Sequence, residues 1–154
     1  CKESKITMIK VLSECDPNYD KPNLSFLNAV TTSVLNSQKV TKAEITFIFT
    51  SDELLAELKS KYFNEDHFTD VIAFRLNQYS EPIIEGEVYI SLPRAKENAK
   101  IFEEPYKKEV TRLIVHGCLH LIGFKDKTIS EKKIMTDLEN NILDQTNWEL
   151  IFDN

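Results

Sequence analysis

Hydrophobic and polar residues alternate in some segments of the chain and recur at helical spacing in others, and these two patterns predict where the strands and helices lie. Residues 44–50 (EITFIFT) nearly alternate β-branched or aromatic side chains with other residues, which is typical of a half-buried strand. Apolar runs at 6–12 (ITMIKVL), 70–74 (DVIAF) and 87–91 (EVYIS) predict three more strands. In residues 24–37 the apolar side chains recur at helical spacing, so this segment is predicted to be an amphipathic helix.

Capping and breaking residues predict where the other helices begin and end. Thr50 is a candidate N-cap, and the helix after it is expected to bury four apolar side chains, Leu54, Leu55, Leu58 and Tyr62. A helix is expected at 95–102, and Pro105 suits the first turn of a longer helix that Gly123 ends. The last helix is predicted at 130–143, with its first residue, a serine, as the N-cap.

The resulting order is strand, helix, strand, helix, strand, strand and then three helices. This order predicts an α+β fold, in which a small mixed sheet of about four strands carries helices packed mainly on one face. The 154 residues contain no internal repeat and no Gly/Ser-rich linker, so we expect a single domain over residues 1–154.

Composition and charge make some classes of function less plausible than others. The 19 Lys and Arg against 25 Asp and Glu give a formal charge of −6, which disfavours a protein that coats duplex nucleic acid with its whole surface but allows a local basic groove. Three widely spaced cysteines without a CxxC pair favour a reducing compartment. No apolar run approaches the ~20 residues of a membrane span and no signal peptide opens the chain, so we expect a cytoplasmic protein without a membrane partner.

The candidate chemistry lies in residues 113–124 (LIVHGCLHLIGF) and just beyond them. His116 and His120 are four residues apart, which places both imidazoles on one face of a helix, where they can chelate one metal ion. Gly123 lets the chain turn back, so that Asp126 can supply a third ligand. Three protein ligands leave a fourth position for water, which is the arrangement of a catalytic site.

A histidine pair at this spacing is more often a surface or core pair than a metal site. Three observations favour the metal. The pair lies in an apolar stretch, where bare imidazoles need partners. Gly117 costs about 1 kcal/mol against alanine in the middle of a helix, which indicates a close approach to the backbone there. Two of the 3 His and two of the 3 Gly fall within this short segment. Because position 117 is not Glu, the HExxH pattern of metalloproteases is absent and a peptidase is disfavoured.

Three blocks of sequence resemble one known family. Residues 116–124 (HGCLHLIGF) are similar to the HGxLHLxGY signature of the YbeY family, bacterial endoribonucleases that mature ribosomal RNA. Residues 58–74 are similar to its LNxxYRxxDxxTDVLSF stretch and residues 86–91 (GEVYIS) to its GDIxIS strand. The blocks keep the family's order and spacing, and the likeness runs from about residue 44 to residue 143.

This resemblance implies both a fold and an activity. The fold is a small sheet with packed helices and a zincin-like metal-binding helix. The activity is metal-dependent cleavage of single-stranded RNA, linked to maturation of the 3′ end of small-subunit ribosomal RNA and to ribosome quality control. Ribosomal RNA and the small ribosomal subunit are then the expected partners, and a water or hydroxide on the metal is the expected nucleophile or base.

Two positions depart from the family pattern. Asp126 stands where the family has a third histidine, and a carboxylate can replace an imidazole on zinc. We therefore expect one divalent ion, Zn²⁺ first, with Mn, Fe and Ni as alternatives. Phe63 stands where the family has a cleft arginine, and a phenyl ring cannot fork onto phosphate. The candidates for substrate contacts are six cations, Arg112, Arg75, Lys59, Lys61, Lys125 and Lys127.

Some alternatives stay open at this point. Arg112 is either a phosphate contact or an ordinary surface charge. Thr69 and Asp70 are either a wall of the cleft, as the resemblance implies, or the turn before a strand. At the level of function, the first rival is a ribosome-associated binding factor with a structural metal and little or no catalysis. An iron-dependent oxygenase, which also uses two histidines and a carboxylate, is a distant third.

Overall fold

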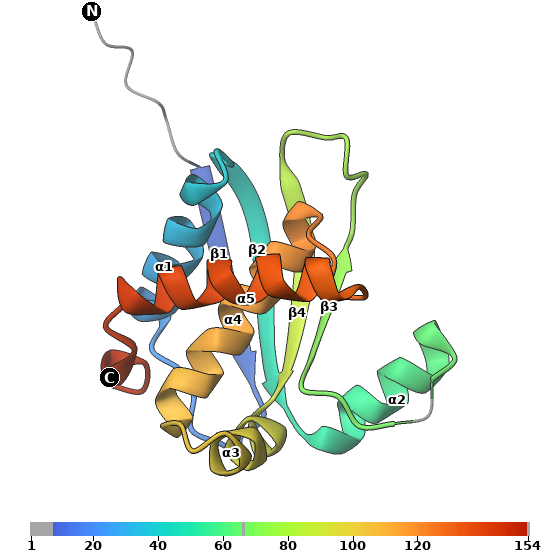
Figure 1. The fold of residues 1–154 in the computed structure, drawn as a ribbon, viewed down its shortest axis with the longest axis vertical. Helices are drawn as coiled ribbons and strands as arrows, with labels where there is room; N and C mark the ends of the chain where they lie inside the picture. Colours follow the sequence, from blue (N-terminus) through green and yellow to red (C-terminus); the bar gives the residue numbers. More distant parts are fainter. Residues whose placement is uncertain (1–7, 66, 154) are drawn as a thin grey trace, which may run out of the picture.

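The computed structural model describes residues 8–65 and 67–153, which form one four-stranded mixed sheet in the order β1-β2-β4-β3. The strands β1 (Met8–Cys15), β2 (Lys42–Thr50) and β4 (Ile84–Ser91) are parallel, whereas β3 (Val71–Arg75) pairs antiparallel with β4 at the edge (Figure 1). The predicted α+β class and the small mixed sheet are confirmed. Residues 6 and 7 of the predicted first strand lie outside the described residues.

The core lies between one face of the sheet and two helices. α1 (Leu24–Ser37) and α4 (Tyr106–Ile122) both cover this face (Figure 1). The strand side chains beneath them are almost fully buried and come mostly from the two central strands, namely Ala43, Ile45, Phe47 and Phe49 of β2 and Ile84, Val88 and Ile90 of β4. Because buried and less buried side chains alternate along β2, helices are needed on one face only, as the sequence pattern predicted.

Two further helices pack against α4, and a short 3-10 turn follows them. α3 (Leu92–Ile101) precedes α4, and α5 (Ile129–Asp144) crosses over α4 on the side away from the sheet (Figure 1). The 3-10 turn, η1 (Trp148–Leu150), lies near the end of the described residues. Within those residues, none of the helices combines the length and the apolar character needed to cross a lipid bilayer.

Two predicted N-caps are displaced by a residue or two. Ser51, and not Thr50, accepts a hydrogen bond from the backbone of the first turn of α2 (Asp52–Phe63). Thr50 is the last residue of β2 and pairs there with β4, so its backbone serves the sheet. Thr128, and not Ser130, caps α5, because Thr128 and Glu131 form a reciprocal capping box.

The predicted buried face of α2 is confirmed only in part. Leu55 is fully buried and Leu54 and Leu58 are half-buried, but Tyr62 is 58% exposed. The reason is position: α2 extends away from the main body beside the β3 edge of the sheet (Figure 1). There the ring of Tyr62 meets Phe74 of β3 edge-on, with centroids 5.5 Å apart.

The close approach predicted at Gly117 is confirmed, and its partner is Val88 of β4. A Cβ atom added at Gly117 would lie 2.5 Å from Cγ1 of Val88, well inside van der Waals contact. The glycine therefore lets α4 lie directly on the sheet. This contact sets the depth of the helix turn that carries His116 and His120.

Candidate metal centre

Three side chains converge at the C-terminal end of α4. His116 and His120 lie on its last turns, and Gly123 ends the helix with a φ of 123°, which turns the chain back toward them. Asp126 follows that turn. The Nε2 atoms of the two histidines are 3.0 Å apart, and Oδ2 of Asp126 lies 3.2 Å from His116 Nε2 and 3.3 Å from His120 Nε2.

The donor set fits one divalent ion. In a tetrahedral zinc site, ligand atoms about 2.0–2.2 Å from the ion lie about 3.3–3.5 Å from one another. The three atoms here form a triangle with sides between 3.0 and 3.3 Å. The lone pairs of two ring nitrogens and a carboxylate oxygen repel one another when they point at the same place, unless a proton or a cation lies among them. His116, His120 and Asp126 thus form a possible metal site.

Behind His116 lies a carboxylate that the sequence analysis missed. Oε2 of Glu139, on α5, is 2.5 Å from Nδ1 of His116. Only 7% of the Glu139 side chain is exposed. When Nδ1–H donates to this carboxylate, Nε2 of His116 is left with a lone pair facing the other two ligands. The apolar stripe of α5 could have revealed it, because Glu139 lies between Met135 and Ile142 on the buried face.

The two histidines are electrostatically different. Burial alone would lower the pKa of His116, but the hydrogen bond and charge of Glu139 outweigh it and raise that pKa above its usual value. For His120, burial and the nearby charge of His116 together lower the pKa. The pair therefore favours a state in which His120 is neutral and free to ligate.

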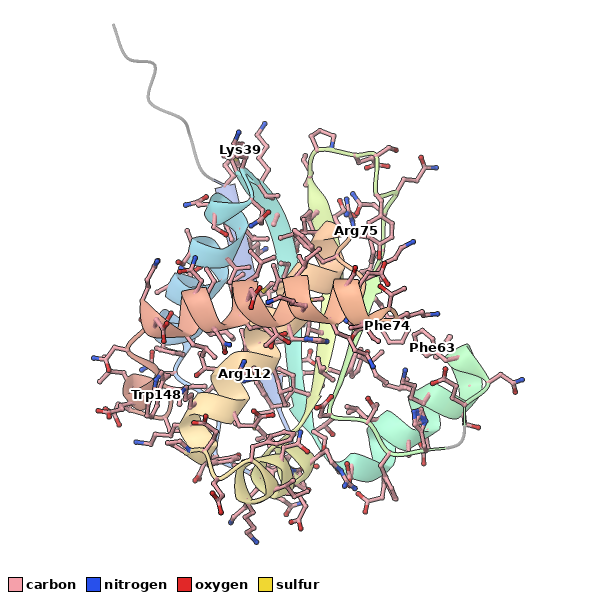
Figure 2. All side chains as sticks on the ribbon, in the orientation of Figure 1. Lys39, Phe63, Phe74, Arg75, Arg112 and Trp148 are labelled. Carbon is pink, nitrogen blue, oxygen red and sulfur yellow. The ribbon has the colours of Figure 1, made fainter. Side chains whose placement is uncertain are left out.

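Glu139 belongs to a chain of buried and half-buried polar groups. Nη1 of Arg112 donates to Oε1 of Glu139 at 3.3 Å, and its Nε lies 3.7 Å from Oε1 of Glu109. Burial raises the pKa of Glu109 to about 7, although Asn98 and Arg112 act in the opposite direction. Nδ2 of Asn98 donates to Glu109 and also to Oδ2 of Asp70, at 3.3 and 3.0 Å. Arg112 on α4 (Figure 2) thus links this helix to Glu139 and Asn140 of α5.

The three candidate ligands open onto a cleft of about 570 Å³. Its walls come from α2, β3, the loop after β3 and the turn after α4. Thr69 and Asp70 are among its lining residues, which agrees with the cleft wall that the family resemblance implied. The polar, charged and aromatic side chains that share the cleft with the ligands include Lys59, Phe63, Glu65, Tyr79, Lys125 and Lys127.

Half of the six candidate cations line this cleft and half do not. Lys59, Lys125 and Lys127 line it, with Lys59 also 3.4 Å from Glu65. The other three, Lys61, Arg75 and Arg112, are not among its lining residues. Lys61 lies over the ring of Tyr62, 5.3 Å from its centroid. Arg75 donates hydrogen bonds to the loop after β3 and to the end of α4.

Phe63, at the end of α2, gives the cleft an aromatic wall. Its ring stacks on Phe74 with centroids 5.8 Å apart, and the two lie side by side at the edge of the sheet (Figure 2). Nζ of Lys59 is 4.6 Å from the centroid of the Phe63 ring. Where the sequence resemblance places an arginine in the family, this chain has a phenyl ring with a lysine against it.

Known proteins match most of the chain. The family described as Endoribonuclease YbeY matches residues 14–147. The chain is 38% identical to Endoribonuclease YbeY of Flavobacterium psychrophilum over 77% of this chain and 83% of that protein. It is 43% identical to Endoribonuclease YbeY of Phocaeicola vulgatus over 65% of this chain and 71% of that protein.

A solved structure is similar in fold. The solution structure of a Thermotoga maritima protein aligns with a TM-score of 0.59 at 24% identity, and the alignment covers 90% of this chain and 91% of that one. The architecture described above is therefore one that an experimental structure also has. The family match over residues 14–147, together with relatives more than one third identical, shows that this chain belongs to the YbeY family of endoribonucleases.

Proposed function

We propose that this chain is a metal-dependent endoribonuclease that cleaves single-stranded RNA in the cleft described above. One observation carries the proposal: two imidazole nitrogens and a carboxylate oxygen lie 3.0–3.3 Å from one another in a cleft that also holds three lysines. We further propose that it acts in the cytoplasm, in maturation of the 3′ end of small-subunit ribosomal RNA and in ribosome quality control, with ribosomal RNA and the small subunit as its partners.

His116, His120 and Asp126 are proposed to hold one divalent ion. Zn²⁺ suits two imidazoles and a carboxylate; the carboxylate also suits Mn, and the imidazoles also suit Fe and Ni. When bound, such an ion lowers the pKa of a coordinated water and polarises a phosphate oxygen. Glu139 keeps Nδ1 of His116 protonated and thereby keeps its Nε2 available as a ligand.

The lysines on the cleft walls are proposed to hold the RNA backbone. Lys125 and Lys127 flank Asp126, so their ammonium groups offset its charge and attract phosphate close to the ligands. Lys59, on the α2 wall of the cleft, attracts phosphate in the same way. Lys61, Arg75 and Arg112 are left out of this role, because they are not among the residues that line the cleft and their cationic groups contact other protein groups.

A ribosome-associated binding factor with a structural metal is the second candidate. The observation that favours it is Phe63, because an aromatic wall supplies no phosphate fork to a transition state. Against it stands the number of ligands: the described residues bring three donors together, whereas a structural zinc site is closed by four.

The test compares cleavage of single-stranded and duplex RNA by the purified chain, with and without a chelator. We expect the single strand to be cut, chelation to abolish cutting and added Zn²⁺ to restore it. His120→Ala should lose both metal and activity. His67→Ala is the matched control, because this exposed histidine lies outside the candidate ligand set. Cleavage that survives both chelation and His120→Ala would refute the mechanism, and metal binding without any cleavage would favour the binding factor.

Whether ribosomal RNA is the substrate is tested separately. We expect the chain to sediment with small ribosomal subunits and to shorten a precursor that extends beyond the 3′ end of their RNA. An unrelated single strand of the same length serves as the control. Equal cutting of both strands, without association with the subunit, would contradict the assignment to ribosomal RNA while leaving the nuclease assignment standing.

A further inference from the structure

The loop between β3 and β4 is fixed by Arg75. The guanidinium of this residue donates to the backbone oxygens of Gln78 and Ile83, at 3.0 and 3.2 Å, and to Oδ1 of Asn77. It also donates to the backbone oxygen of Leu121 at 2.9 Å, which ties the loop to the last turn of α4. The loop is therefore anchored next to the candidate metal ligands.

Tyr79, on this anchored loop, lines the cleft. Its ring centroid lies 5.0 Å from Cζ of Arg75, so the fixed guanidinium supports one face of the ring. A Cβ atom added at Gly123 would lie 3.7 Å from Cδ1 of Tyr79, which places the ring edge against the turn that carries Asp126. Nevertheless, 61% of Tyr79 is exposed, and it lines the cleft together with His120.

A ring held in this way has the properties of a stacking platform. Aromatic side chains in a groove that carries positive charge stack on unpaired bases. Because Arg75 has already fixed the loop, little conformational freedom is lost when a base binds. Lys125 and Lys127 supply the positive charge that the backbone beside such a base requires.

We propose that Tyr79 stacks on an unpaired base of the RNA strand, next to the phosphate held at His116, His120 and Asp126. This inference rests on the proposed function and adds a residue that selects single strands. A base inside a duplex has neighbours on both faces and cannot be reached by the ring. Arg75 acts as the positioning residue for this platform.

The test is binding of a short single-stranded oligonucleotide with 2′-O-methyl riboses, measured by fluorescence anisotropy on the full chain as purified. Tyr79→Ala is expected to weaken binding about tenfold, which corresponds to about 1.4 kcal/mol and lies within the usual range for base–aromatic stacking. Tyr79→Phe keeps the ring and is expected to bind as the unaltered chain does. Tyr62→Ala is the matched control: this tyrosine is 58% exposed and lies outside the cleft lining.

A scan of abasic positions along the oligonucleotide distinguishes stacking from a structural effect. In the unaltered chain, removing one particular base is expected to weaken binding about as much as Tyr79→Ala does. In Tyr79→Ala, removing that base should cost nothing further. Unchanged affinity of Tyr79→Ala, or an equal abasic loss in both proteins, overturns the inference and leaves the proposed function intact. Failure of the unaltered chain to bind any single strand overturns both.

Discussion

Oε2 of Glu139 lies 2.5 Å from Nδ1 of His116, so a residue of α5 orients a candidate metal ligand of α4. Arg112 binds the other carboxylate oxygen of Glu139 and holds it in place. The unit that presents His116 is therefore assembled by tertiary packing, because Glu139 lies more than twenty positions after both Arg112 and His116 in the sequence.

Glu139→Ala is expected to weaken metal binding by about 10–100-fold, the usual cost of losing an outer-shell partner of a ligating histidine. Competition with a chromophoric chelator measures the affinity without recourse to activity. The metal affinity of Glu139→Gln should fall between those of the unaltered chain and Glu139→Ala, because the glutamine amide oxygen can still accept a hydrogen bond from Nδ1. Asp137→Ala, on the exposed face of the same helix, is the control and should bind as the unaltered chain does. Equal affinity in all four proteins would contradict the role given to Glu139.

Glu109 is expected to make stability depend on pH. Its pKa is about 7 in the folded chain against 4.5 in the unfolded one, so the folded state binds more protons between these values. The free energy of unfolding therefore falls as pH rises through that window, by about 3 kcal/mol at most for this group. The groups that face it are Asn98 on α3, Arg112 on α4, Asp70 before β3 and Glu139 on α5.

Denaturant unfolding at pH 5 and pH 8 checks this expectation. Glu109→Gln cannot ionise, so its stability should change less between the two pH values than that of the unaltered chain. A glutamine of similar volume also keeps the hydrogen bond from Asn98 available. If the two proteins show the same dependence on pH, Glu109 does not titrate in this window.

Gly117→Ala is expected to lower the free energy of unfolding by about 1–3 kcal/mol, because its Cβ would overlap Val88. The sign is informative, since alanine is the better helix former by about 1 kcal/mol and would stabilise an unobstructed helix. The double variant with Val88→Ala should lose less than the sum of the two single losses. Strict additivity would show that the two residues do not meet.

Phe63→Arg is expected to bind single-stranded RNA more tightly and with a steeper dependence on salt. One added phosphate contact changes the slope of log affinity against log salt by about 0.7 for a single strand. Phe63→Leu is the control, because it removes the ring without adding charge. Binding measured between low and moderate salt gives both slopes, and equal slopes for Phe63→Arg and the unaltered chain would argue that position 63 does not meet the backbone.

Much of the fold follows from local pattern. The order of strands and helices was predictable because apolar periodicity reports which face of each element is buried. Gly117 was informative for the same reason: a glycine inside a helix of good formers indicates a neighbour, and that neighbour is Val88. The cap at Ser51 was misplaced by one residue, because pairing of Thr50 with β4 is a long-range contact that local sequence does not reveal.

In the candidate site, too, the residues that are close in sequence were predictable and those brought together by tertiary contacts were not. His116, His120 and Asp126 are close in sequence, so helical spacing and a glycine turn bring them together without knowledge of the rest of the fold. Glu139 and Arg75 depend on how α5 crosses α4 and how the β3–β4 loop reaches the end of α4. An arginine that looks free in sequence, such as Arg75, is bound by backbone oxygens that only the folded chain assembles.

The central claim is that His116, His120 and Asp126 hold one divalent ion, and the most direct measurement is the metal content per chain. Elemental analysis after loading with Zn²⁺ and exhaustive dialysis should give close to one ion for the unaltered chain and close to none for Asp126→Ala and His120→Ala. Asp126→His, which supplies a third imidazole, should keep its ion. An unaltered chain that retains no metal, or variants that retain as much as it does, would contradict the account.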